Sequence, residues 1–166
     1  APGARNAVQV CLQVRPDERV TLVTDLEAIE IAAALAREIE TIGCDYSVFV
    51  LEEVGARPLA DGMPARVLED LSRSQVSIFA AAAQTGELRA RIELTDVVNR
   101  HGIRHGHMVN IDKHIMREGM RADFRAVDAL STRLIGMARA ARSIRVESPG
   151  GTRLVALDAT WYFSSQ

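Results

Sequence analysis

Hydrophobic and polar residues alternate along this chain in blocks that have the period of strands and helices in turn. The run RVTLVTD, residues 19–25, is rich in β-branched residues and predicts a strand. From Leu26 onward apolar residues recur every three or four positions, and Gly43 follows them, so we expect a helix that Gly43 ends. Thr24 and Glu27 have the spacing of a capping box for this helix. Its apolar face is predicted to hold Ile29, Ala32, Leu35, Ala36, Ile39 and Ile42.

The same alternation predicts three more strands and two more helices. The third strand is apolar throughout and is expected to be buried on both faces. Because a helix separates each strand from the next, we expect the strands to pair in parallel. The fold class is therefore α/β, a three-layer α/β/α arrangement around a mainly parallel sheet. The expected strands are 46–51, 75–83 and 107–112, and the expected helices are 65–74 and about 87–99, with a Pro- and Gly-containing loop at 58–64.

The last third of the chain predicts a long helix and a hairpin. An amphipathic pattern runs from Asp123 to about Arg142, and its apolar stripe is expected to face a core. The runs 143–147 and 152–158 then read as two antiparallel strands joined by SPGG, a type II turn in which Gly150 supplies the positive φ. The stripe is Phe124, Val127, Leu130, Leu134, Met137, Ala138 and Ala141.

These patterns suggest an α/β domain over residues 1–142 and a hairpin and tail over 143–166. A lone hairpin is barely stable in water, and nothing follows the aromatic run 161–163 for it to pack on. The chain also opens on Ala1 and not on methionine. We therefore expect a second, C-terminal domain beyond Gln166.

Composition narrows the class of protein. Of 166 residues, 48% are hydrophobic and 25% are charged, a globular balance. The net charge of −2 gives no electrostatic footprint for nucleic acid, and neither a signal peptide nor a membrane-spanning run is present. Cys11 and Cys44 lie far apart in apolar settings, and we expect both to be small buried hydrophobes. A cytoplasmic location with no nucleic-acid or membrane partner follows as the expectation.

The four histidines lie within residues 101–114, which raises the question of a metal site. His101 and His105 have the i, i+4 spacing of zinc ligands on a helix, but glycines beside them disfavour a regular helix there. His105 and His107 would share one face of a strand, with no acidic residue or cysteine near them before Asp112. We therefore interpret this stretch as a polar, glycine-broken turn that leads into the fourth strand.

Other motifs give no active site. Thr85 and Gly86 fall at a predicted helix start, where free N–H groups could accept an anion, but no GxGxxG or Walker sequence is present. No nucleophile elbow or HExxH motif occurs, and the acidic residues mostly fall on helix exteriors or in first turns. We assign no catalytic, cofactor-binding or metal-binding residue to this chain.

Two stretches carry a resemblance to a known family. RPDERVTLVTDLEAIEIAAALAREIETIGCDYSVFVL combines a strand, an acidic turn and a long helix that ends in a glycine. MREGMRADFRAVDALSTRLIGMARAARSIRVESPGGTRLVALD places Asp123 and Phe124 before a long helix, then a strand–turn–strand with Gly151 and Thr152. In this order the features resemble the aminopeptidase T family, the thermophilic-type metallo-aminopeptidases, over most of the chain.

The resemblance implies a two-domain enzyme that removes N-terminal residues from peptides with two divalent metal ions of the zinc or cobalt type. Its ligands would be glutamates, histidines and an aspartate of the C-terminal domain, so this chain would be a non-catalytic N-terminal domain whose partner is that domain. A homodimer is also open. Family members commonly place an acidic residue after Gly-Thr, whereas Arg153 stands here, which puts a true peptidase in doubt.

Three alternatives stay open. Ring-cleaving dioxygenases that act on dihydroxypyridines with iron share this architecture, so the whole protein could be a relative of that kind. The chain could instead be a stand-alone ligand-binding or interaction module whose apolar tail docks a partner. It could also be a self-contained metalloenzyme that uses His101, His105 and His107.

Overall fold

The computed structural model describes residues 2–157, which fall into two compact units divided between Ala122 and Asp123. The sequence-based boundary at residue 142 separates the long C-terminal helix from the hairpin, whereas the contacts group the two elements in one unit. The aromatic run 161–163 and the tail predicted around it lie outside the described residues. Each unit is described by itself below.

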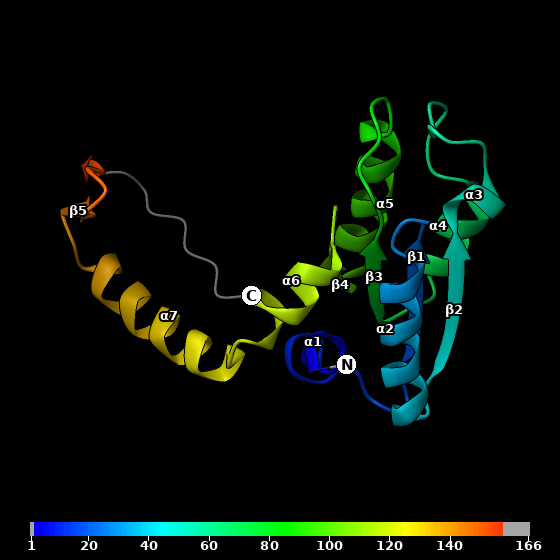
Figure 1. The fold of residues 1–166 in the computed structure, drawn as a ribbon, viewed down its shortest axis with the longest axis horizontal. Coiled ribbons are helices and arrows are strands. Elements are labelled where there is room, and N and C mark those ends of the chain that lie inside the picture. Colours follow the sequence, from blue (N-terminus) through cyan, green and yellow to red (C-terminus); the bar gives the residue numbers. More distant parts are fainter. Residues whose placement is uncertain (1, 158–166) are drawn as a thin grey trace. The chain divides into compact units, whose positions relative to one another are not determined.

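The first unit holds a four-stranded parallel sheet between two layers of helices, as the sequence predicts (Figure 1). The strand order is β2-β1-β3-β4, with β1 hydrogen-bonded to both β2 and β3. All five residues of β3 are buried, as expected for a central strand covered on both faces. The elements are α1 (Pro2–Arg5), the π-helix η1 (Asn6–Cys11), β1 (Arg19–Thr24), α2 (Ile29–Ile42), β2 (Asp45–Val50), α3 (Leu51–Val54), α4 (Ala65–Leu71), β3 (Val76–Ala80), α5 (Leu88–His101), β4 (Arg104–His107), α6 (Lys113–Arg117) and the 3-10 turn η2 (Gly119–Arg121).

Two apolar clusters fill the space between the sheet and its helices. One cluster joins the sheet to α2 and to the N-terminal segment, and its members include Val8, Leu22, Leu35, Ile39 and Ile78. The other joins the opposite face of the sheet to α4 and α5, and its members include Val23, Leu71, Phe79, Leu94 and Val98. Side chains that alternate along β3 thus enter different layers of the core.

Helix α2 ends where the sequence predicts and begins later. Gly43 adopts the left-handed conformation, with φ of 83°, and its N–H bonds to the carbonyls of Ile39 and Glu40. The predicted capping box between Thr24 and Glu27 is wrong. Thr24 belongs to β1, and the carboxylate of Asp25 accepts the N–H of Ala28 at 2.8 Å in its place.

The fourth strand lies three residues earlier than predicted, at Arg104–His107 in place of 107–112. Gly102, with φ of 62°, ends α5 in a left-handed turn, and Arg104 pairs with the third strand almost at once. Gly106 lies inside this strand, and a Cβ there would make only ordinary contact with Leu12, at 3.4 Å. The predicted turn into the fourth strand is therefore present at Gly102, whereas Gly106 belongs to the strand itself.

The N-terminal segment, for which the sequence analysis makes no prediction, packs against α2 and bonds to the last residues of the first unit. The side-chain amide of Asn6 donates to the carbonyls of Met120 and Ala122, at 2.9 and 3.1 Å. Ala4, Ala7 and Val8 are buried in the apolar cluster on the α2 face. Cys44 is buried as predicted, but Cys11 is exposed at the end of η1, so that part of the prediction is wrong.

The second unit consists of α7 (Phe124–Arg139) and an antiparallel hairpin of β5 (Ser143–Glu147) and β6 (Arg153–Leu157). Asp123 caps α7 by accepting the N–H groups of Arg125 and Ala126. The hairpin is confirmed, but the glycine with positive φ is Gly151, at 93°, and not Gly150. The turn is closed by hydrogen bonds that pair Ser148 with Gly151 and Thr152.

Candidate functional site

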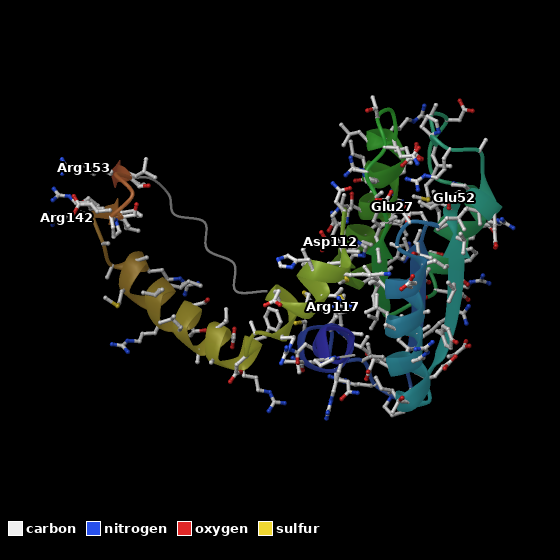
Figure 2. The ribbon with its side chains drawn as sticks, viewed as in Figure 1. Glu27, Glu52, Asp112, Arg117, Arg142 and Arg153 are labelled. Carbon is white, nitrogen blue, oxygen red and sulfur yellow. The ribbon has the colours of Figure 1, made fainter. Side chains whose placement is uncertain are left out.

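The carboxyl edge of the parallel sheet is where α/β folds of this kind usually bind their ligands. Strand β2 lies on one side of β1 and strand β3 lies on the other, so the direction in which the chain adds strands to the sheet reverses after β2. Ligands bind in the crevice that such a reversal opens beyond the strand ends. Here that position holds Asp25, which follows β1, and Ala82, which follows β3. Figure 2 labels Glu27 and Glu52 at this edge.

The side chain of Asp25 joins the segment that follows β1 to the segment that follows β3. Its Oδ1 accepts the N–H of Ala28, and its Oδ2 accepts the N–H of Ala82 at 2.7 Å and a guanidinium hydrogen of Arg57 at 2.7 Å. The side chain is 1% exposed. Three hydrogen bonds from the protein therefore occupy most of the acceptor positions of this buried carboxylate, and few are left for a ligand.

Arg57 reaches into the edge from the loop between α3 and α4 and uses all five of its N–H donors. Nε and Nη2 form a two-pronged contact with the carboxylate of Glu87, at 2.7 and 2.5 Å. Nη1 donates to Asp25 at 2.7 Å and to Glu52 at 3.2 Å, and Nη2 also donates to the carbonyl of Ala82 at 2.9 Å. We call Asp25, Glu52, Arg57 and Glu87 the carboxyl-edge cluster.

Two members of the carboxyl-edge cluster, Glu87 and Arg57, have pKa values shifted toward their charged forms. The hydrogen bonds from Arg57 lower the pKa of Glu87 against the opposing effect of burial. The same contact with Glu87, together with that to Asp25, raises the pKa of Arg57. Because every donor of the guanidinium is used and Arg57 is only 4% exposed, the chain's own side chain fills the crevice. The hydrogen bonds of Arg57 link its loop to the residues after β1, after β2 and after β3, and no N–H group of Arg57 is left for a ligand.

Acid is expected to weaken the first unit through Glu87. Its pKa is lowered from the ordinary value of 4.5 in the folded protein, so the stabilisation is complete above pH 4.5 and is lost as the pH falls through the folded value. In urea unfolding, the difference in free energy of unfolding between the wild type and Glu87→Gln should therefore shrink from about pH 6 to about pH 3. A difference that is constant over this range would contradict the assignment.

A second polar network lies at the opposite end of the sheet, under α4. Asp70 accepts hydrogen bonds from Arg19 at 2.7 Å, from Thr21 at 2.7 Å and from Ser47 at 3.2 Å. Burial alone would raise the pKa of Asp70, and the hydrogen bonds from Arg19 and Thr21 outweigh it and lower that pKa. The network joins β1, β2 and α4. We interpret it as structural.

The structure brings two of the four histidines together. His105 and His107 point to the same face of β4, with His105 Nε2 and His107 Nδ1 3.1 Å apart. Ser77 Oγ lies 2.7 Å from His105 Nδ1, and Phe79 stacks on the ring of His107 with centroids 5.7 Å apart. Burial lowers the pKa of His105 to about 4, and burial and then the charge of Arg91 lower the pKa of His107.

The other two histidines do not join this pair. His101 is exposed in the last turn of α5, and His114 is exposed on α6. Within residues 2–157, no group of three or more His, Cys, Asp and Glu side chains is placed to hold a metal ion. The described residues therefore do not fit the two-metal centre that the family resemblance implies.

Thr85 and Gly86, weighed above as an anion site, lie in the turn before α5, whose N-cap residue is Glu87. The Glu87 carboxylate bonds to Arg57 and to the N–H of Leu59 at 3.0 Å. A carboxylate so close to the helix start opposes a second anion. Two open grooves elsewhere, of about 630 and 450 Å³, share Pro2 and Arg121 in linings that mix cations with carboxylates.

Helix α7 has an apolar face that the described residues of its own unit leave largely uncovered, and what the predicted core-facing stripe contacts stays a prediction. None of its residues is buried. The exposed fractions are 49% for Val127, 57% for Leu130, 53% for Leu134 and 64% for Met137. Helical spacing of apolar residues predicts an amphipathic helix and does not identify what its apolar face contacts. None of the helices in residues 2–157 is long and apolar enough to cross a membrane.

The sequence analysis missed the carboxyl-edge cluster. Acidic residues at helix starts are ordinarily solvated, and Arg57 lies in a loop whose path the residue pattern does not predict. A usable signal was the position of Asp25, directly after a buried β-branched run, where the carboxyl end of a parallel strand places it at the crevice.

Comparison with known proteins gives a structural likeness at low sequence identity. No protein-family model and no curated protein matches the sequence. Among solved structures, wild-type AmpT from Thermus thermophilus superposes with a TM-score of 0.59 and 15% identity, over 93% of this chain and 52% of AmpT. The chain thus spans about half the length of AmpT. At this identity the likeness shows the fold alone.

Proposed function

We propose that this chain is the non-catalytic N-terminal domain of a metal-dependent, aminopeptidase-like protein. The observation that carries the proposal is the likeness to AmpT, an aminopeptidase T, over nearly the whole of this chain and about half of that protein. In this proposal the reaction is the removal of N-terminal residues from peptides, and the remaining half holds two divalent ions with glutamate, histidine and aspartate ligands.

The chemistry of the described residues supports a scaffold role. The crevice at the carboxyl edge is filled by Arg57, and its carboxylates are bonded to the chain's own donors. Ser77, the hydroxyl beside His105, is 1% exposed, so it is not accessible as a nucleophile. On this proposal the first unit shapes access to a centre built elsewhere and performs no bond cleavage.

A second candidate, an interaction module, is favoured by one observation, the exposed apolar face of α7. The two candidates differ in what they require of the protein. The aminopeptidase proposal requires a metal-binding half in the same polypeptide, whereas an interaction module requires none.

An assay of the chain on aminoacyl 4-nitroanilides with added Co²⁺ or Zn²⁺ tests the absence of catalysis. We expect no turnover above a blank that contains the metal alone, because the described residues do not assemble a two-metal site. Turnover above the blank that survives repurification would overturn the scaffold role.

The coding sequence after the Gln166 codon tests the rest of the proposal. We expect it to encode a cluster of Glu, His and Asp, and we expect the extended protein to release the nitroaniline with Co²⁺ or Zn²⁺ and to stop when a chelator is added. An extended protein that lacks such a cluster, or that stays inactive with either metal, would favour the interaction module.

A further inference from the structure

Among the described residues, His105 and His107 of β4 form a pair of metal-ligating side chains that the scaffold role does not use. His105 and His107 are separated by Gly106, so the alternation of the strand puts both rings on the face that looks toward α5. His107 is exposed and His105 is half-buried, so solvent reaches the pair.

The spacing of the two rings suits one metal ion. Zn–N bonds are about 2.0–2.1 Å long, so two nitrogens of a tetrahedral site lie about 3.3 Å apart. His105 Nε2 and His107 Nδ1 are 3.1 Å apart. The two nitrogens point toward each other across a shared proton, so both rings must turn before their lone pairs converge on one ion.

The neighbours of the pair orient His105 as a ligand. Ser77 Oγ, 2.7 Å from His105 Nδ1, can accept the N–H of that nitrogen and leave Nε2 as the free lone pair. The proton that the two rings share in the absence of metal then moves to His107 Nε2. Metal binding therefore needs no net proton loss from the pair when both rings are neutral.

We propose that His105 and His107 form a two-histidine chelate for a single borderline transition metal ion of the Ni²⁺, Cu²⁺ or Zn²⁺ type. Imidazole suits these ions, whereas Mg²⁺ and Ca²⁺ prefer oxygen ligands. The described residues supply no third ligand, so water fills the other positions and the ion exchanges readily. The positive charge of Arg91 acts on His107 and opposes the cation, which limits the affinity.

Calorimetric titration of the untagged chain with NiCl₂ and with ZnCl₂ at pH 7.5 tests the chelate. Every protein carries Cys11→Ser, because Cys11 is exposed and its thiol could bind the same ions. We expect one ion per chain, and His107→Gln should weaken binding by roughly tenfold or more. His107 is exposed, so this variant should keep the unfolding midpoint of its parent in the absence of metal.

His101→Gln and His114→Gln are the matched controls, since both histidines are exposed and neither belongs to the pair. Both controls should bind within about twofold of the parent, and MgCl₂ should give no binding heat. Absence of binding by the parent, equal binding by His107→Gln, or loss of binding in either control would each overturn the proposal. The readout uses no peptidase activity, so it is independent of the proposed function.

Discussion

Replacement of Arg57 by alanine is expected to lower the free energy of unfolding of the first unit by about 3–5 kcal/mol. The variant leaves the carboxylates of Asp25 and Glu87, which are 1% and 3% exposed, without their common partner. A buried charge that loses its partner keeps the full cost of its desolvation. Urea unfolding monitored by circular dichroism measures the loss.

Arg89→Ala is the matched control for this experiment. Arg89 makes one ion pair with Glu93, on the surface of α5, and is 69% exposed. A pair of this kind contributes about 0.5 kcal/mol or less. Arg57→Lys, which keeps the charge but has too few donors for the same contacts, should fall between the two. If Arg57→Ala stayed within about 1 kcal/mol of the wild type, the carboxyl-edge cluster would be no structural tie and the crevice would be open to a ligand.

Leu35→Ala and Leu134→Ala are expected to differ strongly, although they are the same substitution on the apolar faces of two similar helices. Leu35 of α2 is fully buried, so its truncation should cost about 2–5 kcal/mol. Leu134 of α7 is 53% exposed, and its truncation should cost about 0.5 kcal/mol or less. Urea unfolding of each variant, with hydrogen exchange to assign the loss to a unit, provides the measurement.

The outcome for Leu134 decides whether the exposed face of α7 describes the isolated chain. A cost for Leu134→Ala as large as that for Leu35→Ala would mean that something covers α7 in solution. That result would confirm the sequence-based prediction that the apolar stripe of α7 packs against other residues. A small cost, together with full folding of the first unit, would leave that face available for a contact outside the chain.

The layers of the first unit are predictable from the sequence because one physical signal dominates them. In β3 and α2 the apolar period, the cap at Gly43 and the need to bury both faces of a central strand agree. The parallel pairing then follows from the helices between the strands.

The candidate sites are less predictable because they depend on contacts between distant residues. Arg57 lies 30 residues from Glu87 and 32 from Asp25, and no local period brings them together. The start of the fourth strand was predicted too late because Gly102 and Gly106 both suggest a turn in sequence, whereas only Gly102 makes one and Gly106 lies inside β4. Glycine indicates conformational freedom but not which use the fold makes of it.

The hydrogen bonds from Asn6 to Met120 and Ala122 have a consequence for how the chain acquires its structure during synthesis. They join residues 114 and 116 positions apart, so the beginning of the first unit is fixed by its end. On the ribosome, the helical N-terminal segment emerges before the residues to which Asn6 bonds, and it cannot make these contacts until Ala122 has left the exit tunnel. Contacts between residues so far apart in the sequence slow folding. The N-terminal segment that packs on α2 is therefore held in place only after the last turn of the unit has formed.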